Sequence, residues 1–317
     1  MHTKKLECST RSLLDKYIQM DMLLIHYAHP TATLDHLDVN LVSDWKNLSK
    51  GKLLVQPFNL DATTISKHPQ LWSLLFATVV EITNSQDVSV CAPKTKANSP
   101  HTSFSFLIYN ITEKQTQTLL KQCVWSSTAI TFSVSTLNPV CLDYLFSIKG
   151  LTTMDNEVVL DTVKEVWQDP ASLTFLQQIC QSILKNLREQ VTLTLQLFIT
   201  SLHISRLDIK LRGGAIAPVF NVYANGALID NDNAWSQLRS YFASCSYAPQ
   251  AQDPGNTIIA PFNCSLCHTA DHPRGLCPFP SMEGWNGPKR HIPIGASGGN
   301  GGGPGPGSDG QKKLQLN

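Results

Sequence analysis

The sequence has almost no net charge, which limits the partners that it can attract through space. Its 317 residues include 25 Lys and Arg against 24 Asp and Glu, a formal net charge of +1 at pH 7. This balance excludes a protein-wide positive field of the kind that draws nucleic acid to basic proteins. Any phosphate-binding role must therefore be local.

The sequence also lacks a long apolar run. Its most apolar stretch, residues 71–82, is too short to span a bilayer and contains Glu81. The N-terminus lacks the uninterrupted apolar core and small-residue cleavage site of a secretory signal. We therefore expect an intracellular protein, cytoplasmic or nuclear, that is not secreted and has no membrane partner. Of its nine cysteines, three lie in a C-terminal cluster, and the other six are expected to be reduced core thiols.

Motifs of the common enzyme classes are missing as well. No Walker lysine follows a glycine-rich loop, no HExxH pattern occurs, and no GxSxG elbow joins a strand to a helix. The segment Arg212-Gly-Gly lacks the strand–loop–helix context of a phosphate cradle. His203 falls in a predicted strand, where an exposed strand residue explains it better than a catalytic base. We predict that the chain is not an enzyme.

A dense cluster of metal-binding side chains near the C-terminus is the strongest signal in the sequence. Cys264, Cys267, His272 and Cys277 follow the spacing C-x2-C-x4-H-x4-C. Three thiolates and one imidazole complete the tetrahedral shell of Zn²⁺ and leave no position for a catalytic water. We therefore predict one structural Zn²⁺, whose binding supplies folding free energy on the order of 10 kcal/mol in small zinc modules. His268 directly follows Cys267 and would crowd the same face of the ion, which favours His272.

With its surroundings, CSLCHTADHPRGLCPFP followed by GW, this run resembles the zinc knuckle of retroviral and retrotransposon gag-type proteins. The match covers residues 264–285 only. Two positions depart from the usual knuckle, because Asp271 replaces the glycine before the histidine and Ser265 replaces an early aromatic residue. The layout of an α/β body, a knuckle and a low-complexity tail is also similar to retroelement-derived proteins of fungal genomes, some of which carry RRM-like domains.

This resemblance implies binding of single-stranded RNA or DNA, through base stacking on aromatic side chains and phosphate contacts from basic ones. Packing of the knuckle against the body is an alternative role for both aromatic residues, and it is favoured for Phe279. Asp271 and Glu283 dilute the positive charge, so we expect weak and salt-sensitive binding. The candidate contacts are Phe279 and Trp285 for bases, and Arg274, Lys289 and Arg290 for phosphates.

The rest of the chain predicts an α+β fold. Residues 1–50 are predicted as a helical N-terminal arm, with a helix over residues 9–25 and loops after it. The body over residues 51–250 alternates strands and helices as a βαββαβ unit does. We therefore expect one or two RRM-like units, over residues 51–141 and 142–250. The body also carries aromatic residues at alternate strand positions, which a plain core explains better than an RRM does, because half-buried strands favour aromatic residues.

Three further expectations concern particular segments. A faint similarity between residues 106–132 and 144–175 agrees with duplicated strand–helix units, and chance resemblance explains it equally well. Residues 192–199 alternate apolar and polar side chains, which predicts a strand. The zinc knuckle is placed at residues 258–287. The Gly- and Pro-rich residues 288–317 are expected to form a disordered tail, because they cannot bury apolar surface.

The preferred hypothesis is a non-enzymatic protein of retroelement origin that binds single-stranded nucleic acid. The alternative is a zinc-stabilised protein-interaction or assembly module, in which the knuckle docks on a partner or on the chain's own body. Self-association is possible under either hypothesis. A degenerate enzyme fragment is the third interpretation.

Overall fold

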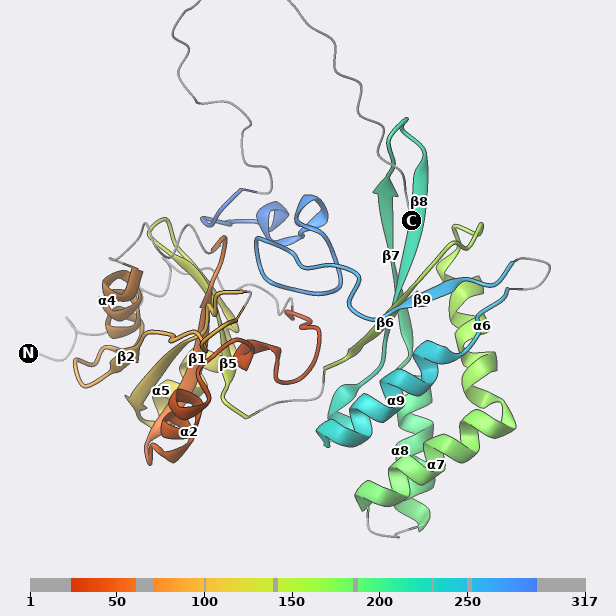
Figure 1. The fold of residues 1–317 in the computed structure, drawn as a ribbon, viewed down its shortest axis with the longest axis horizontal. Coiled ribbons are helices and arrows are strands. Elements are labelled where there is room, and N and C mark those ends of the chain that lie inside the picture. Colours follow the sequence, from red (N-terminus) through yellow and green to blue (C-terminus); the bar gives the residue numbers. More distant parts are fainter. Residues whose placement is uncertain are drawn as a thin grey trace, which may run out of the picture.

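The computed structural model describes residues 24–60, 71–99, 101–138, 142–184, 188–229, 231–249 and 253–289. Helices and two antiparallel sheets make up these residues, which confirms the predicted α+β class (Figure 1). Most of the helix predicted over residues 9–25 lies outside the described residues, as does nearly all of the predicted tail, from Arg290 onward. Within the described residues, every helix is too short or too polar to cross a bilayer.

The first sheet has five strands in the order β2-β3-β1-β5-β4, each antiparallel to its neighbours. Helix α4 (Leu71–Thr83) follows β1, and helix α5 (Glu113–Lys121) follows β3. The strands and two helices together are called the first unit. The strands are β1 (Gly51–Pro57), β2 (Ser89–Cys91), β3 (Phe106–Ile111), β4 (Val124–Ser126) and β5 (Thr131–Thr136).

Both faces of the first sheet are buried. Leu53 and Val55 point to the side of α4 and α5, where they join an apolar core. Leu54 alternates to the opposite side and packs with Trp45 of helix α2 (Val39–Asn47). The sequence predicted loops where α2 lies, yet the Asp38 side chain caps this helix by accepting from two backbone N–H groups. The part of the arm after residue 30 therefore covers the first sheet.

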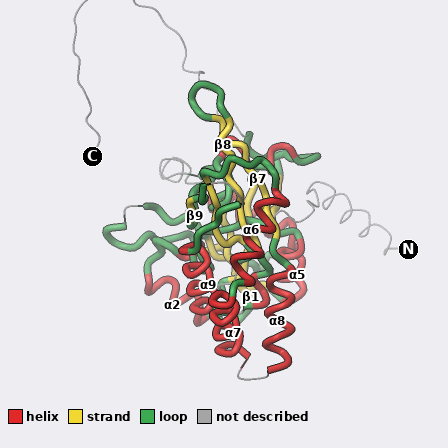
Figure 2. The backbone as a smooth tube through the Cα atoms, turned by 90° about the vertical axis from the view of Figure 1, so that its right-hand side faces the viewer, coloured by secondary structure: helices red, strands yellow, loops and turns green. Residues whose placement is uncertain are grey.

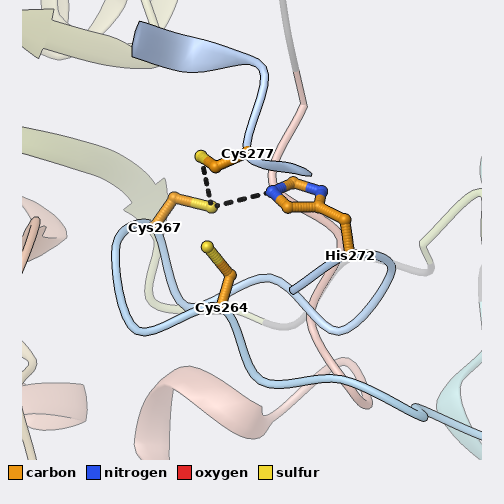
Figure 3. A group of neighbouring side chains, drawn as sticks. All are labelled: Cys264, Cys267, His272 and Cys277. Carbon is orange, nitrogen blue, oxygen red and sulfur yellow. Dashed lines mark hydrogen bonds between the residues drawn. The ribbon is translucent and has the colours of Figure 1, made fainter. Parts of the chain in front are cut away.

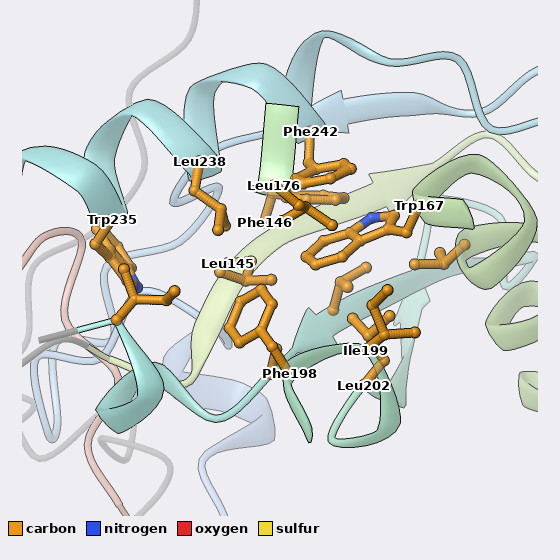
Figure 4. Close-up of a cluster of buried hydrophobic side chains, with 14 of the residues drawn as sticks. Leu145, Phe146, Trp167, Leu176, Phe198, Ile199, Leu202, Trp235, Leu238 and Phe242 are labelled. Atoms are coloured by element: carbon orange, nitrogen blue, oxygen red, sulfur yellow. The ribbon is translucent and has the colours of Figure 1, made fainter. Parts of the chain in front are cut away.

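The second sheet has four strands in the order β7-β8-β6-β9, again all antiparallel. It forms the second unit with four helices, whose core includes Trp167 stacked on Phe242 at 3.7 Å (Figure 4). The strands are β6 (Tyr144–Lys149), β7 (His203–Lys210), β8 (Ile216–Tyr223) and β9 (Asn256–Ile258). The helices are α6 (Asn156–Gln168), α7 (Pro170–Leu184), α8 (Arg188–Thr200) and α9 (Asp232–Ser244).

The two sheets share one arrangement. In each, the first strand is central, the next strand lies beyond the third, and the last strand pairs on the other side of the first. Strand β1 therefore corresponds to β6, whereas the similarity noted between residues 106–132 and 144–175 pairs β3 with β6. That alignment is wrong by two strands. Because β9 pairs with β6, the second sheet ends at Ile258, in a region predicted as linker and approach to the knuckle.

The strand predicted over residues 192–199 is wrong, because these residues lie in helix α8. Val191, Phe198 and Ile199 are buried in the core of the second unit, which is a helical spacing. Leu193 and Leu197 fit the alternating pattern but are exposed, at 55% and 48%. Over eight residues, the apolar pattern of a strand and that of a helix overlap. The helix forms because it buries the apolar residues at both ends of the segment.

Residues 259–289, which are called the metal region, follow the second sheet and lie beside both units (Figure 1). Within them, residues 264–277 are called the knuckle. A strap of residues 24–29 runs along the knuckle and bonds to it. The hairpin of β7 and β8 projects beyond the rest of the second unit (Figure 2).

Candidate metal centre

The knuckle brings the four predicted ligands together. The ligand atoms of Cys264, Cys267, His272 and Cys277 all lie within 4.8 Å of one another (Figure 3). Cys267 Sγ is 3.5 Å from His272 Nε2 and 3.8 Å from Cys277 Sγ. The three thiols have no exposed surface, and His272 is 7% exposed. This buried group could hold one metal ion.

A tight turn places the first two ligands. The backbone N–H of His268 donates to the Cys264 carbonyl at 2.7 Å, and His268 itself has a left-handed φ of 66°. Its ring points away from the thiols, because it stacks on Phe104 at 5.3 Å and donates from Nε2 to the Pro57 carbonyl at 3.2 Å. The prediction that His272 rather than His268 completes the group is therefore in agreement with the structure.

Asp271 holds His272 in place. Its Oδ1 lies 2.7 Å from His272 Nδ1 and also accepts from the Thr269 hydroxyl at 2.8 Å. With a proton on Nδ1, the lone pair of Nε2 faces the thiols, which is how outer carboxylates orient metal-binding histidines. From the sequence alone, Asp271 is a departure from the usual glycine and a negative charge that weakens the predicted nucleic-acid binding. An acidic residue directly before a ligand histidine was the signal that could have indicated this role.

The charges in the centre depend on one another. Burial alone would raise the pKa of Asp271, but the hydrogen bond and charge of His272 outweigh it and lower that pKa. Burial alone would lower the pKa of His272, but its hydrogen bonds to Asp271 and to the thiols raise it to about 11. In the metal-free centre, Asp271 is therefore an ionised carboxylate and His272 an imidazolium at neutral pH, and a bound cation would replace the Nε2 proton.

Cys264 and Cys267 differ in how readily they ionise. Hydrogen bonds from Cys267 and then Cys277 lower the pKa of Cys264, and a hydrogen bond from His272 adds to this effect. Hydrogen bonds to Cys264 and Cys277, together with burial, raise the pKa of Cys267. The surroundings therefore favour the thiolate of Cys264 and oppose that of Cys267.

A chain of hydrogen bonds joins this centre to the second sheet. The Tyr223 hydroxyl donates to Asp271 Oδ2 at 2.9 Å, and Asn221 Nδ2 donates to the Asp271 carbonyl at 2.8 Å. The Ser147 hydroxyl in turn donates to Asn221 Oδ1 at 2.6 Å and lies 2.9 Å from the Tyr144 hydroxyl. All five residues are buried. The outer face of the second sheet therefore shapes the surroundings of His272.

The first unit holds the opposite side of the knuckle. The backbone N–H of Asn59 donates to the Leu266 carbonyl at 2.8 Å. Phe58 meets Phe279 edge to face, with ring centres 5.1 Å apart. Both rings belong to an apolar cluster that also contains the three ligand cysteines. The thiols are thus buried by residues far away in the sequence.

The strap covers a third side of the knuckle. The backbone N–H of Ala270 donates to the His26 carbonyl at 2.6 Å, and the backbone N–H of His26 donates to the Thr269 hydroxyl at 3.1 Å. The strap is tied to the second unit by Arg239, which donates to the carbonyls of Ala28 and Leu145. Three separate parts of the chain therefore meet at the knuckle.

The predicted nucleic-acid contacts are mostly engaged inside the protein. Phe279 is 1% exposed and leaves no ring face free for a base. Trp285 is half-buried against Phe279, and its indole N–H donates to the Pro288 carbonyl at 2.9 Å. Arg274 donates to Asn59 Oδ1 at 2.6 Å and to the carbonyls of Ser265 and Lys289. Lys289 is exposed, and Arg290 lies outside the described residues.

Comparison of the chain with protein-family models, with curated proteins and with solved structures finds no match. Inference about function therefore rests on the geometry of the chain itself.

Proposed function

We propose that Cys264, Cys267, His272 and Cys277 bind one structural Zn²⁺, which fastens the knuckle to both units. The distances between ligand atoms support this proposal. Two thiolates bound tetrahedrally to Zn²⁺ at about 2.3 Å lie about 3.8 Å apart, and a thiolate and an imidazole lie about 3.6 Å apart. The observed values are 3.8 Å between the Cys267 and Cys277 sulfurs, and 3.5 Å between Cys267 Sγ and His272 Nε2.

The role of the ion in this proposal is structural. Four protein ligands close a tetrahedral shell and leave no position for a reacting water, so the centre suits folding rather than catalysis. The orientation of His272 by Asp271, and of Asp271 by Tyr223, carries the proposal. Through these hydrogen bonds, the residues around the metal ligands include Tyr223 of the second sheet. Metal binding therefore favours docking of the knuckle on that sheet.

For the whole chain, we propose a non-enzymatic, zinc-stabilised interaction module with two RRM-like units. The repeated strand order supports the RRM-like description, because a βαββαβ unit with its first and third strands adjacent occurs twice. Asn59, Asn221 and Tyr223 donate hydrogen bonds to the knuckle from the two units. These bonds support a role of the zinc in holding the two units and the knuckle together.

Binding of single-stranded RNA or DNA, with a retroelement origin, is the second candidate. It rests on the resemblance of the knuckle and on exposed cations. Lys289 is exposed at the edge of the metal region, and Lys210 and Arg212 are exposed near the turn of the projecting hairpin (Figure 2). Because Tyr144 and Tyr223 are buried beneath the knuckle, this candidate assigns phosphate binding to the hairpin and the knuckle edge.

Metal analysis tests the first proposal. The purified chain is expected to contain one Zn²⁺ per molecule, and Cys267→Ser should remove it. Cys245→Ser is the matched control, because this half-buried free thiol lies in the second unit away from the knuckle. A chain with no stoichiometric zinc, or with zinc retained in Cys267→Ser, would contradict the proposal.

Titration with labelled single-stranded RNA and DNA tests the second candidate. Binding should weaken steeply with salt, and a Lys210→Ala, Arg212→Ala double variant should lose part of that salt dependence. Absence of binding at low salt, with zinc present, contradicts nucleic-acid binding and favours the interaction module.

A further inference from the structure

The metal centre is covered on nearly every side. Phe58 and Phe279 lie over the cysteines from the first unit and the knuckle, and the strap bonds along residues 269–270. The three thiols have no exposed surface. An ion that binds here after the chain has folded needs a route through the surrounding residues.

A groove of about 460 Å³ supplies an opening toward one ligand. It reaches His272 and Asp271 at its inner end. Leu276 and Pro278 of the metal region form one wall, and Ser205 and Leu207 of strand β7 lie on the other. The groove therefore runs between the metal region and the base of the projecting hairpin.

Metal-binding side chains line this groove outside the centre itself. His26, Asp143 and His203 all belong to its lining. His203 is exposed, and its ring stacks on Tyr223 at 4.8 Å with an interplanar angle of 8°. The His26 ring lies 5.0 Å from the same tyrosine, and Tyr223 donates to Asp271. Imidazoles and carboxylates thus extend from the surface to the outer neighbour of His272.

We propose that this groove is the route by which a divalent metal ion enters and leaves the Cys3His centre, with His203 as its outermost transient ligand. The inference rests on the proposed zinc site and adds a role for residues that do not belong to it. Imidazole and carboxylate groups are ordinary ligands of divalent metals. A transient ligand at the mouth lowers the barrier in both directions, so it changes rates without changing the amount of metal bound at the end.

The test measures metal exchange on the full, zinc-loaded chain. Release is followed with an excess of a chromogenic chelator, and loading is followed after Zn²⁺ is added back to the metal-free chain. His203→Ala is expected to slow both rates several-fold while the final stoichiometry stays at that of the unchanged chain. Leu207→Trp, which fills the groove, is expected to slow both rates as well.

Ile209→Trp is the matched control, because Ile209 lies on the same face of β7, two residues beyond the groove. It should leave both rates unchanged. Unchanged or faster exchange in His203→Ala overturns the route, even if Leu207→Trp fails to fold. Release that rises with low urea in step with global unfolding also overturns it. The zinc content of the unchanged chain is measured before any rate. If that chain contains no zinc, the proposed metal centre itself is overturned.

Discussion

The two units share a strand order, yet their outer faces are covered in different ways. The first sheet lies under the apolar side chains of the arm, where Trp45 packs on Leu54 and Leu107. The second sheet lies under the knuckle, where Tyr223 and Asn221 hydrogen-bond to Asp271. An apolar cover depends on burial alone, whereas a polar cover needs its acceptors held in place. If the proposed Zn²⁺ site is correct, the second cover depends on the metal and the first does not.

Loss of the metal should produce the largest difference in stability between the covers of the two sheets. Metal binding to small zinc modules contributes on the order of 10 kcal/mol, and Cys267→Ser removes one of four ligands. We expect the knuckle to lose its shape, so that β8 becomes open to hydrogen exchange while α2 stays protected. Hydrogen exchange read by mass spectrometry, with Cys245→Ser as control, checks this. Equal loss of protection in α2 and β8 would show that the arm and the knuckle unfold together, which contradicts the independence of the two covers.

Trp45→Ala should produce the opposite pattern. The side chain is 3% exposed, and truncation of a buried aromatic residue costs about 3–5 kcal/mol. We expect lower stability of the first unit in urea with one bound metal ion retained. Trp45→Phe is the milder control, because the indole N–H is buried without a hydrogen-bond acceptor among the described residues. Metal loss in Trp45→Ala would contradict the independence of the two covers.

Asp271→Asn should weaken the metal centre without removing a ligand. Loss of an outer carboxylate that orients a ligand histidine costs about 10–100-fold in metal affinity. The amide keeps nearly the same shape, so packing against the second sheet is preserved. Competition with a chelator of known affinity measures the change. Affinity equal to that of the unchanged chain would show that Asp271 serves only to dock the knuckle.

Tyr223→Phe should give the smallest change. It removes the hydrogen bond to the ionised carboxylate, which contributes about 1.5 kcal/mol, together with the weaker one that the hydroxyl accepts from Asn221, and it leaves the ring in place. We expect β8 to exchange faster and metal affinity to fall less than in Asp271→Asn. Tyr241→Phe on α9 is the control, because its ring stacks on Phe175 away from the knuckle. A larger loss of metal affinity than in Asp271→Asn would show that the contact of Tyr223 with Asp271 matters more for metal binding than the contact of Asp271 with His272.

Much of the local structure could be predicted from the sequence. Strand β1 and helix α5 each combine a periodic apolar pattern with clear flanking signals, so local sequence is enough to indicate them. Strand β2 has only three residues, which are too few to show a period. Helix α8 was predicted as a strand, because Val191, which marks the start of its buried face, lies outside the alternating segment.

The sequence by itself determined the metal-ligand set and the α+β class. Four ligands within one short run can reach a single ion whatever surrounds them, so their spacing predicts the group. Alternating strand and helix periods likewise require only near neighbours in the chain.

Only the tertiary structure decided what surrounds those ligands. Asp271 orients His272 because Tyr223, far away in the sequence, donates to its second oxygen. Phe279 is buried because Phe58 of the first unit meets its ring. These contacts join residues that lie far apart along the chain. Hydrogen bonding and burial at these positions therefore follow from the docking of the two units on the knuckle.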